Sequence, residues 1–113
     1  MIDRALIMLP EWADIILKGY KTWEIRNRNT NIRGRIGLIA KGTKAIVGEV
    51  DIVDSFPLTK GLFENNVHRH RLLCTYEQLP QNYKYVWVLE NPVLYDIPVR
   101  YEHPKGAQVW VKL

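Results

Sequence analysis

Gly19-Tyr20-Lys21-Thr22-Trp23-Glu24-Ile25-Arg26 is the segment in which the spacing of apolar residues changes from helical to extended. Before it, Pro10 and the apolar residues that follow at helical spacing predict a helix of about nine residues. Gly19 is placed to end that helix in the left-handed conformation. After it, Trp23 and Ile25 lie on one face of a predicted strand, and polar residues lie on the other.

The rest of the chain is mostly short apolar or alternating runs, which predict further strands. These runs are residues 4–8, 34–40, 45–53, 85–90 and 108–113. We predict a connection at 54–60, a break at Asn91-Pro92, and one or two short helices within 61–81. Gly37 and Gly48 are expected to mark bulges or close backbone approaches. The sequence therefore predicts a mainly β, α+β fold of five or six strands, as a small barrel or a strongly curved sheet.

Length and composition indicate an ordinary globular protein. The chain has 113 residues, 47% hydrophobic and 25% charged, which fits a single domain spanning 1–113. Cys74 is the only cysteine, so a disulfide within the chain is excluded and a reducing compartment is favoured. The sequence has no apolar run long enough to span a membrane, and its start does not resemble a signal peptide. We therefore expect a cytoplasmic location.

The positive charge is concentrated in one quarter of the chain. Residues 21–44 contain seven basic side chains and the single acid Glu24, a net charge of +6, whereas the whole chain carries +4. Such a cluster is often only a solvated loop, but a nucleic acid is the partner that this charge permits. Its position next to the patterned strand favours an RNA-contacting surface.

The polar face of the predicted strand groups an acceptor with cations. Side chains two residues apart on one strand face are about 7 Å apart, so Glu24 and Arg26 lie close together. A solvated, charged edge is one interpretation. In the other, Glu24 accepts the exocyclic amine of a base, Arg26 holds a phosphate, and Lys21 is a point charge or an activated amine.

Residues 19–26 resemble the G-x-K-T-x-E-x-R motif of ASCH domains, a group of PUA-like domains. The resemblance extends through 33–40, 47–50, 104–107 and 109–111, and covers nearly the whole chain except about 61–81. It implies a PUA-like β-barrel with a cleft beside the motif strand, and a role in binding RNA or modified nucleosides.

Members of this family are described as binding modules, as ribonucleases, and as amidohydrolases that deacetylate N4-acetylcytidine. The small amidohydrolases use a Lys, a Thr and a Glu. Lys21 matches the lysine, but the threonine position is Glu24 here, and only Glu64 or Glu77 suggest themselves as a third member. We therefore expect a binding domain, with a hydrolase or a protein–protein adaptor as alternatives.

For a hydrolase, Lys21 is the candidate base or nucleophile and Glu24 the candidate general acid–base. Tyr20 and Thr22 are expected to hydrogen-bond the substrate's carbonyl oxygen. Further substrate or RNA contacts are expected from three basic residues and one hydroxyl: Arg26, Arg28, Lys41 and Thr43. No cofactor is expected.

The remaining polar and aromatic residues have plainer interpretations. His68 and His70, with His103, could bind a metal or serve a ribonuclease, but without accompanying ligand spacing we expect a surface histidine pair and no metal site. Cys74 is expected to be half-buried packing, and Glu90 either flanks the cleft or caps a strand. The four tryptophans lie on apolar faces, so most are expected in the core.

Overall fold

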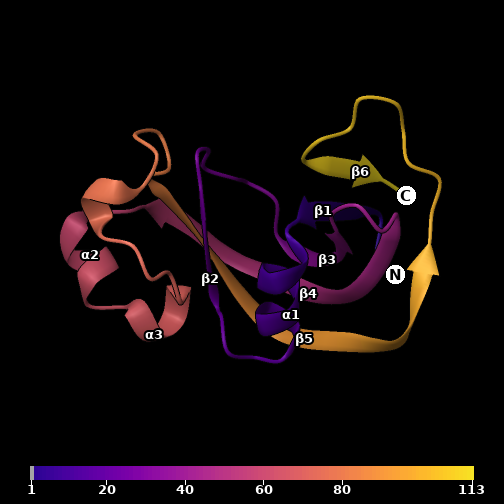
Figure 1. The fold of residues 1–113 in the computed structure, drawn as a ribbon, viewed down its shortest axis with the longest axis horizontal. Helices are drawn as coiled ribbons and strands as arrows, with labels where there is room; N and C mark the ends of the chain where they lie inside the picture. Colours follow the sequence, from indigo (N-terminus) through magenta and orange to yellow (C-terminus); the bar gives the residue numbers. More distant parts are fainter. Residues whose placement is uncertain (1) are drawn as a thin grey trace.

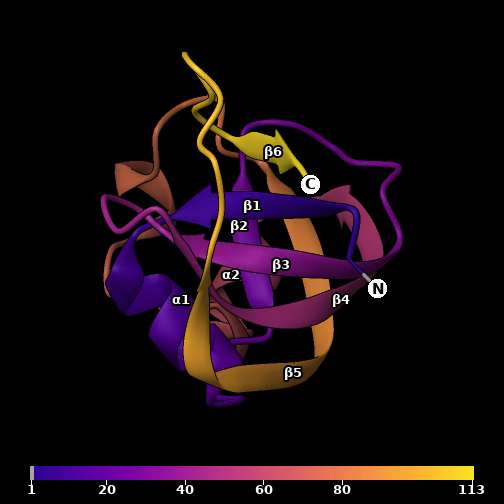
Figure 2. The same ribbon diagram turned by 90° about the vertical axis from the view of Figure 1, so that its right-hand side faces the viewer.

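One strongly curled six-stranded sheet organises the chain in the computed structural model, which describes residues 2–113. The strand order is β2-β5-β4-β3-β1-β6; β1 and β3 are parallel and the other neighbours antiparallel. The strands are β1 (Arg4–Met8), β2 (Trp23–Arg26), β3 (Gly34–Ala40), β4 (Ala45–Pro57), β5 (Tyr85–Arg100) and β6 (Trp110–Lys112). Figure 2 shows the curl. The mainly β, α+β prediction is confirmed, although the sheet is an open half-barrel with β2 and β6 at its edges.

Helix α1 (Pro10–Leu17) follows β1 and ends as predicted, with Gly19 at φ +85°. Its buried residues, Ala13, Ile16 and Leu17, pack into the main core between the helix and the sheet. Gly48 of β4 permits this packing. A Cβ atom there would lie 2.5 Å from the Val93 carbonyl oxygen and 2.6 Å from Leu17 Cδ1, so this glycine marks a close approach.

Strands β4 and β5 are longer than the sequence predicted, and they make the curl. β4 continues through Pro57, and β5 continues through Asn91-Pro92, so the predicted connection and break were wrong there. The pairing of β4 with β5 shifts register at three places, one of them opposite residues 91 and 92. A bulge bends a strand and tolerates a proline, which is why the chain crosses this dipeptide as a strand.

The region 61–81, which has no clear pattern, forms three short helical turns. Figure 1 shows α2 (Lys60–Glu64) and α3 (Val67–His70) beyond β2, at one end of the molecule, and a 3₁₀ turn, Tyr76–Gln78, follows. Phe63 and Leu79 from this region pack with Trp23 and Ile25 of β2 in a second core cluster. No helix within residues 2–113 has the length and apolar character needed to cross a membrane.

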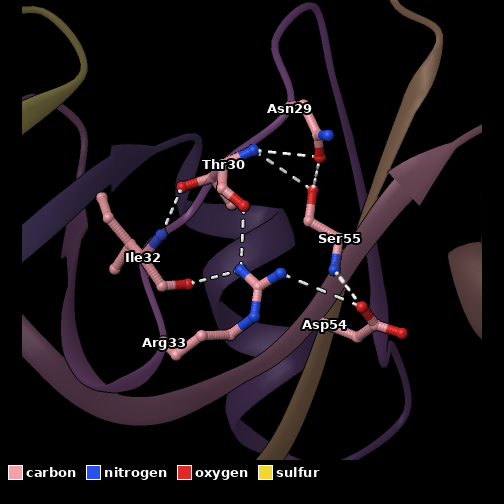
Figure 3. A network of polar contacts seen from close by, with 6 residues as sticks. All are labelled: Asn29, Thr30, Ile32, Arg33, Asp54 and Ser55. Atoms are coloured by element: carbon pink, nitrogen blue, oxygen red, sulfur yellow. Dashed lines mark hydrogen bonds and ion pairs between the residues drawn. The ribbon is translucent and has the colours of Figure 1, made fainter.

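The loop between β2 and β3 is fastened to the end of β4 (Figure 3). Arg33 Nη1 donates to the carbonyl oxygens of Thr30 and Ile32, both at 2.8 Å, and Nη2 lies 3.9 Å from Asp54 Oδ1. Ser55 Oγ bonds Asn29 and accepts from the Thr30 N–H at 3.3 Å. These contacts hold the loop in one shape.

Candidate functional site

A cavity of about 480 Å³ lies beside β2, between β1, α1 and the segment 72–83. Its charged lining consists of Lys21, Glu24, Arg26 and Lys41. The rest is mostly apolar or aromatic, including Met8, Trp12, Leu72, Leu79 and Tyr83. Few polar groups in a mainly apolar hollow are typical of a small-molecule site.

Lys21 has the most buried charged side chain of this site, with 1% of its surface exposed. Its Nζ donates to the His70 carbonyl oxygen at 2.5 Å, lies 3.8 Å from Glu24 Oε1, and stands 4.9 Å from the centre of a Trp12 ring. A carbonyl, a carboxylate and an aromatic face are the partners that an ammonium group needs away from water. The side chain is therefore fixed in the cavity wall.

Burial lowers the pKa of Lys21 below its ordinary value of 10.5. Removal from water disfavours the charged form, and Glu24 opposes that effect by attracting the ammonium charge. Arg26 adds a smaller lowering of the pKa through like-charge repulsion.

Glu24 is held between two cations. Arg26 Nε and Nη2 both lie 3.0 Å from Glu24 Oε2, while Oε1 faces Lys21 at a distance too long for a hydrogen bond. Arg26 is fixed further by the Ile7 carbonyl oxygen at 3.3 Å and by the Trp87 ring. Within residues 2–113, Oε1 accepts no hydrogen bond and Arg26 Nη1 has no partner. These two atoms remain available to a ligand.

His70 holds Lys21 through its backbone carbonyl oxygen, a role that the sequence did not reveal. The prediction of a surface histidine pair was wrong for His70, which is fully buried and stacked on Phe63, whereas His68 is exposed. His70 Nδ1 accepts from the Leu72 N–H at 3.0 Å, so Nε2 carries the proton that bonds the Phe63 carbonyl oxygen at 2.8 Å. Burial lowers the pKa of this imidazole, which favours the neutral form.

Several predicted site residues lie outside the cavity. Tyr20 is 60% exposed, and Arg28 is exposed and lines none of the hollows described here. Thr22 and Glu90 line a smaller hollow of about 220 Å³. Thr43 Oγ1 donates to the Ala40 carbonyl oxygen at 2.7 Å and so closes a turn.

The basic stretch 21–44 is partly neutralised within the protein. Arg35 lies 3.0 Å from Glu49 and 3.2 Å from Asp51, and Arg33 lies near Asp54. Their charges are therefore directed at β4. Lys41 and Lys44, in contrast, form no ion pair within residues 2–113.

The remaining candidates do not complete a catalytic or metal site in the described residues. Glu64 and Glu77 do not line the cavity, and Glu77 pairs with Lys60 at 2.8 Å. His103 bonds Tyr101 and the Ala107 carbonyl oxygen through its two ring nitrogens. Cys74 is half-buried at the cavity wall, as predicted for packing, and no group of three or more His, Cys, Asp or Glu within 2–113 is placed to hold a metal ion.

The fold is similar to solved structures of an ASCH protein from Zymomonas mobilis. The crystal structure of that protein superposes with a TM-score of 0.72 at 16% identity, covering 97% of this chain and 86% of the other. Its Ser-to-Ala mutant gives 0.71 at 17% identity over 97% and 87%. Its Tyr-to-Phe mutant gives 0.70 at 16% identity over 100% and 91%.

A comparison with curated proteins found no match. The family model described as ASCH domain matches residues 6–98, which include part or all of every strand except β6 and the whole of the motif strand β2. This chain therefore belongs to the ASCH domain family.

Proposed function

We propose that this domain binds RNA or a modified nucleoside by taking one base into the cavity beside β2. The observation that carries the proposal is the Glu24 carboxylate, fixed between Lys21 and Arg26 with its Oε1 free of hydrogen bonds within residues 2–113. A fixed carboxylate accepts a hydrogen bond from an exocyclic amine, such as N4 of cytosine. Membership of the ASCH family supports a domain of the RNA-binding type in general.

The shape and lining of the cavity support a base as the ligand. Its volume of about 480 Å³ lies within the range for small-molecule sites, roughly 300–1,000 Å³. Apolar and aromatic side chains, among them Met8, Trp12 and Tyr83, offer surfaces to a planar ring. The ammonium group of Lys21, 3.8 Å from Glu24 Oε1, holds this acceptor oxygen in place by its charge.

The test is calorimetric titration of cytidine, N4-acetylcytidine and uridine into the wild-type protein and two variants. We expect cytidine and N4-acetylcytidine, which both carry an N–H donor at N4, to bind more tightly than uridine. Glu24→Gln should remove that preference, because an amide replaces a carboxylate whose two oxygens both accept hydrogen bonds. The control is Asp51→Asn, which changes a carboxylate outside the cavity and should leave all three affinities unchanged. Equal affinities for the three nucleosides, or no binding of any, would contradict the proposal.

An amidohydrolase is the second candidate, favoured by one observation: a buried lysine with a lowered pKa beside a carboxylate. In this reaction Glu24 would take a proton from water as it attacks the acetyl carbonyl, and would return it to the departing amine. It ranks second because Lys21 already donates to the His70 carbonyl oxygen and Glu24 is the single carboxylate in the described lining.

Acetate release from N4-acetylcytidine tests this candidate. If the protein is a hydrolase, Lys21→Met should abolish turnover while circular dichroism shows an intact fold. If the wild-type protein binds the nucleoside but releases no acetate, the amidohydrolase candidate is excluded and the binding function remains.

A further inference from the structure

A second cavity of about 660 Å³ adjoins the first. The two share five lining residues: Ile7, Arg26, Lys41, Tyr83 and Gln108. Residues that face both hollows form the boundary between them, so the hollows are two compartments of one depression. We call the cavity with Glu24 the inner compartment and the other the outer compartment.

The two compartments differ in charge. The inner one contains a carboxylate, whereas the outer one is lined by Arg26, Lys41 and Lys44 with no acidic residue among its described lining. Neither lysine forms an ion pair within residues 2–113. The outer compartment therefore attracts anions, whereas the inner one also offers a carboxylate that accepts hydrogen bonds.

The two lysines belong to a turn of fixed shape. After β3, the Lys41 N–H donates to the Met8 carbonyl oxygen at 2.8 Å, and Thr43 Oγ1 donates to the Ala40 carbonyl oxygen. Gly42 at φ +90° and Lys44 at φ +54° take the left-handed conformations that the turn requires. The turn that carries the two lysines is thus fixed by hydrogen bonds, although both lysine side chains are exposed.

Arg26 stands at the boundary with one free end. Its Nε and Nη2 are engaged by Glu24 and the Ile7 carbonyl oxygen, which leaves Nη1 without a partner in the described residues. Arg26 is a lining residue of both compartments. An anionic group that accepts from Nη1 leaves the contacts of Nε and Nη2 with Glu24 in place.

Aromatic rings complete the outer compartment. Tyr83 lies at the boundary, and Tyr101 lies further out with its hydroxyl 2.7 Å from His103 Nδ1. Basic side chains that follow a backbone, combined with aromatic rings on which bases stack, are the combination found in single-strand binding sites.

We propose that the outer compartment holds the phosphodiester and neighbouring nucleotide of a single-stranded RNA whose base occupies the inner compartment. The ligand is then a strand and not a free nucleoside. This inference rests on the proposed function, because it needs a base in the inner compartment. The Arg26 Nη1 group and Lys41 meet the phosphodiester at the boundary, and Lys44 meets the next phosphate.

The experiment compares cytidine with a short single-stranded RNA of five nucleotides that contains one cytidine. We expect the RNA to bind at least tenfold more tightly, and its affinity to fall with salt, by a slope of about 0.7 in log–log units for each phosphate contacted. Lys44→Glu should weaken RNA binding about tenfold and reduce the slope, yet leave cytidine binding unchanged, since Lys44 lines the outer compartment alone.

The matched control is Lys112→Glu, an equal change of charge on an exposed lysine of β6 that lines neither compartment. It should weaken RNA binding much less than Lys44→Glu does. Equal effects of the two variants would overturn the inference, because they would show a general charge effect.

Two further outcomes separate this inference from the proposed function. If cytidine binds but the added nucleotides bring no gain, the outer compartment is not a strand site and the proposed function stands. If neither ligand binds, both fail. Displacement of the RNA by polyglutamate at equal charge concentration would also overturn the inference, because the compartment would then be a general anion site.

Discussion

Two clusters of arginine and carboxylate lie on the same sheet, and they differ in what they leave unsatisfied. At the cavity, Lys21 and Arg26 share the single carboxylate of Glu24. On β3 and β4, the single Arg35 serves both Glu49 and Asp51; with Tyr95 of β5 these residues form what we call the closed cluster. The first has more cations than acids, and the second has more acids than cations.

Burial also differs between them. The side chains of Glu24 and Lys21 are 9% and 1% exposed, whereas Arg35, Glu49 and Asp51 are each 26% exposed. In the closed cluster, Arg35 also donates to the Asn91 carbonyl oxygen at 2.6 Å and Tyr95 donates to Glu49 at 2.6 Å. Its polar groups satisfy one another, whereas the cavity cluster leaves a carboxylate oxygen and a guanidinium nitrogen open. Hydrogen-bonding groups without a partner beside a cavity therefore mark the site better than charge alone.

The largest difference between the two clusters is expected when one carboxylate charge is removed from each. Glu24→Gln leaves the buried Lys21 and the partly buried Arg26 without a counter-charge, and we expect the free energy of unfolding to fall by about 3 kcal/mol. Asp51→Asn leaves Arg35 paired with Glu49 at a partly solvated position, and we expect a loss of at most about 1 kcal/mol.

Urea denaturation at neutral pH measures both losses. Equal losses in the two variants would show that the difference in burial and pairing does not matter energetically. The wild-type slope of free energy against urea serves as the check that both variants unfold from the same folded state.

The cavity cluster could be partly predicted because its residues are local in sequence. Glu24 and Arg26 are two apart on one strand, so the alternation of β2 was enough to place them together. Lys21 follows the end of α1, which Gly19 marked. What the alternation could not give was burial: it left a solvated edge and a ligand-contacting face both open, and the structure buries Glu24.

The groups that hold Lys21 in place could not be predicted, because they are backbone groups that lie in single helical turns. The His70 carbonyl oxygen holds Lys21, and a carbonyl has no side-chain signal. Helix α3 is four residues long, too short to show a helical period. Likewise, the pairing of Arg35 with Glu49 and Asp51 depends on the register between β3 and β4, which a single sequence does not specify.

Acidification should lower stability in two separate pH ranges, one set by His70, whose carbonyl oxygen holds Lys21 of the cavity cluster, and one set by Glu49 of the closed cluster. His70 has a pKa lowered from 6.5 by burial, so the unfolded chain binds its proton first and stability falls as pH drops below about 6.5. The slope is at most about 1.4 kcal/mol per pH unit. The pKa of Glu49 is lowered from 4.5, chiefly by the Tyr95 hydrogen bond, so the contribution of the closed cluster is lost only below about pH 4.5.

Urea denaturation between pH 5 and 7.5 tests this separation. His70→Gln should flatten the dependence, while the exposed control His68→Gln should retain it. If His70→Gln does not fold, the ring resonances of His70 in the wild-type protein can be followed instead, and they should not titrate near pH 6.5. A His70 resonance that titrates there would contradict the expectation.

The smallest effect is expected from Tyr95→Phe, which tests whether the closed cluster is only structural. The variant removes the hydrogen bond to Glu49, and we expect a loss of about 1 kcal/mol at pH 8, because Glu49 keeps its bond from Arg35. Burial raises the pKa of Tyr95 to about 12, so its contribution is present below pH 10 and is lost as the pH rises toward 12. The difference between wild type and variant should therefore narrow above pH 10. The affinity of the variant for nucleosides should equal that of the wild type, since Tyr95 does not line the inner compartment. A change of affinity would mean that the two clusters are coupled through β4 and β5, and that the closed cluster belongs to the site.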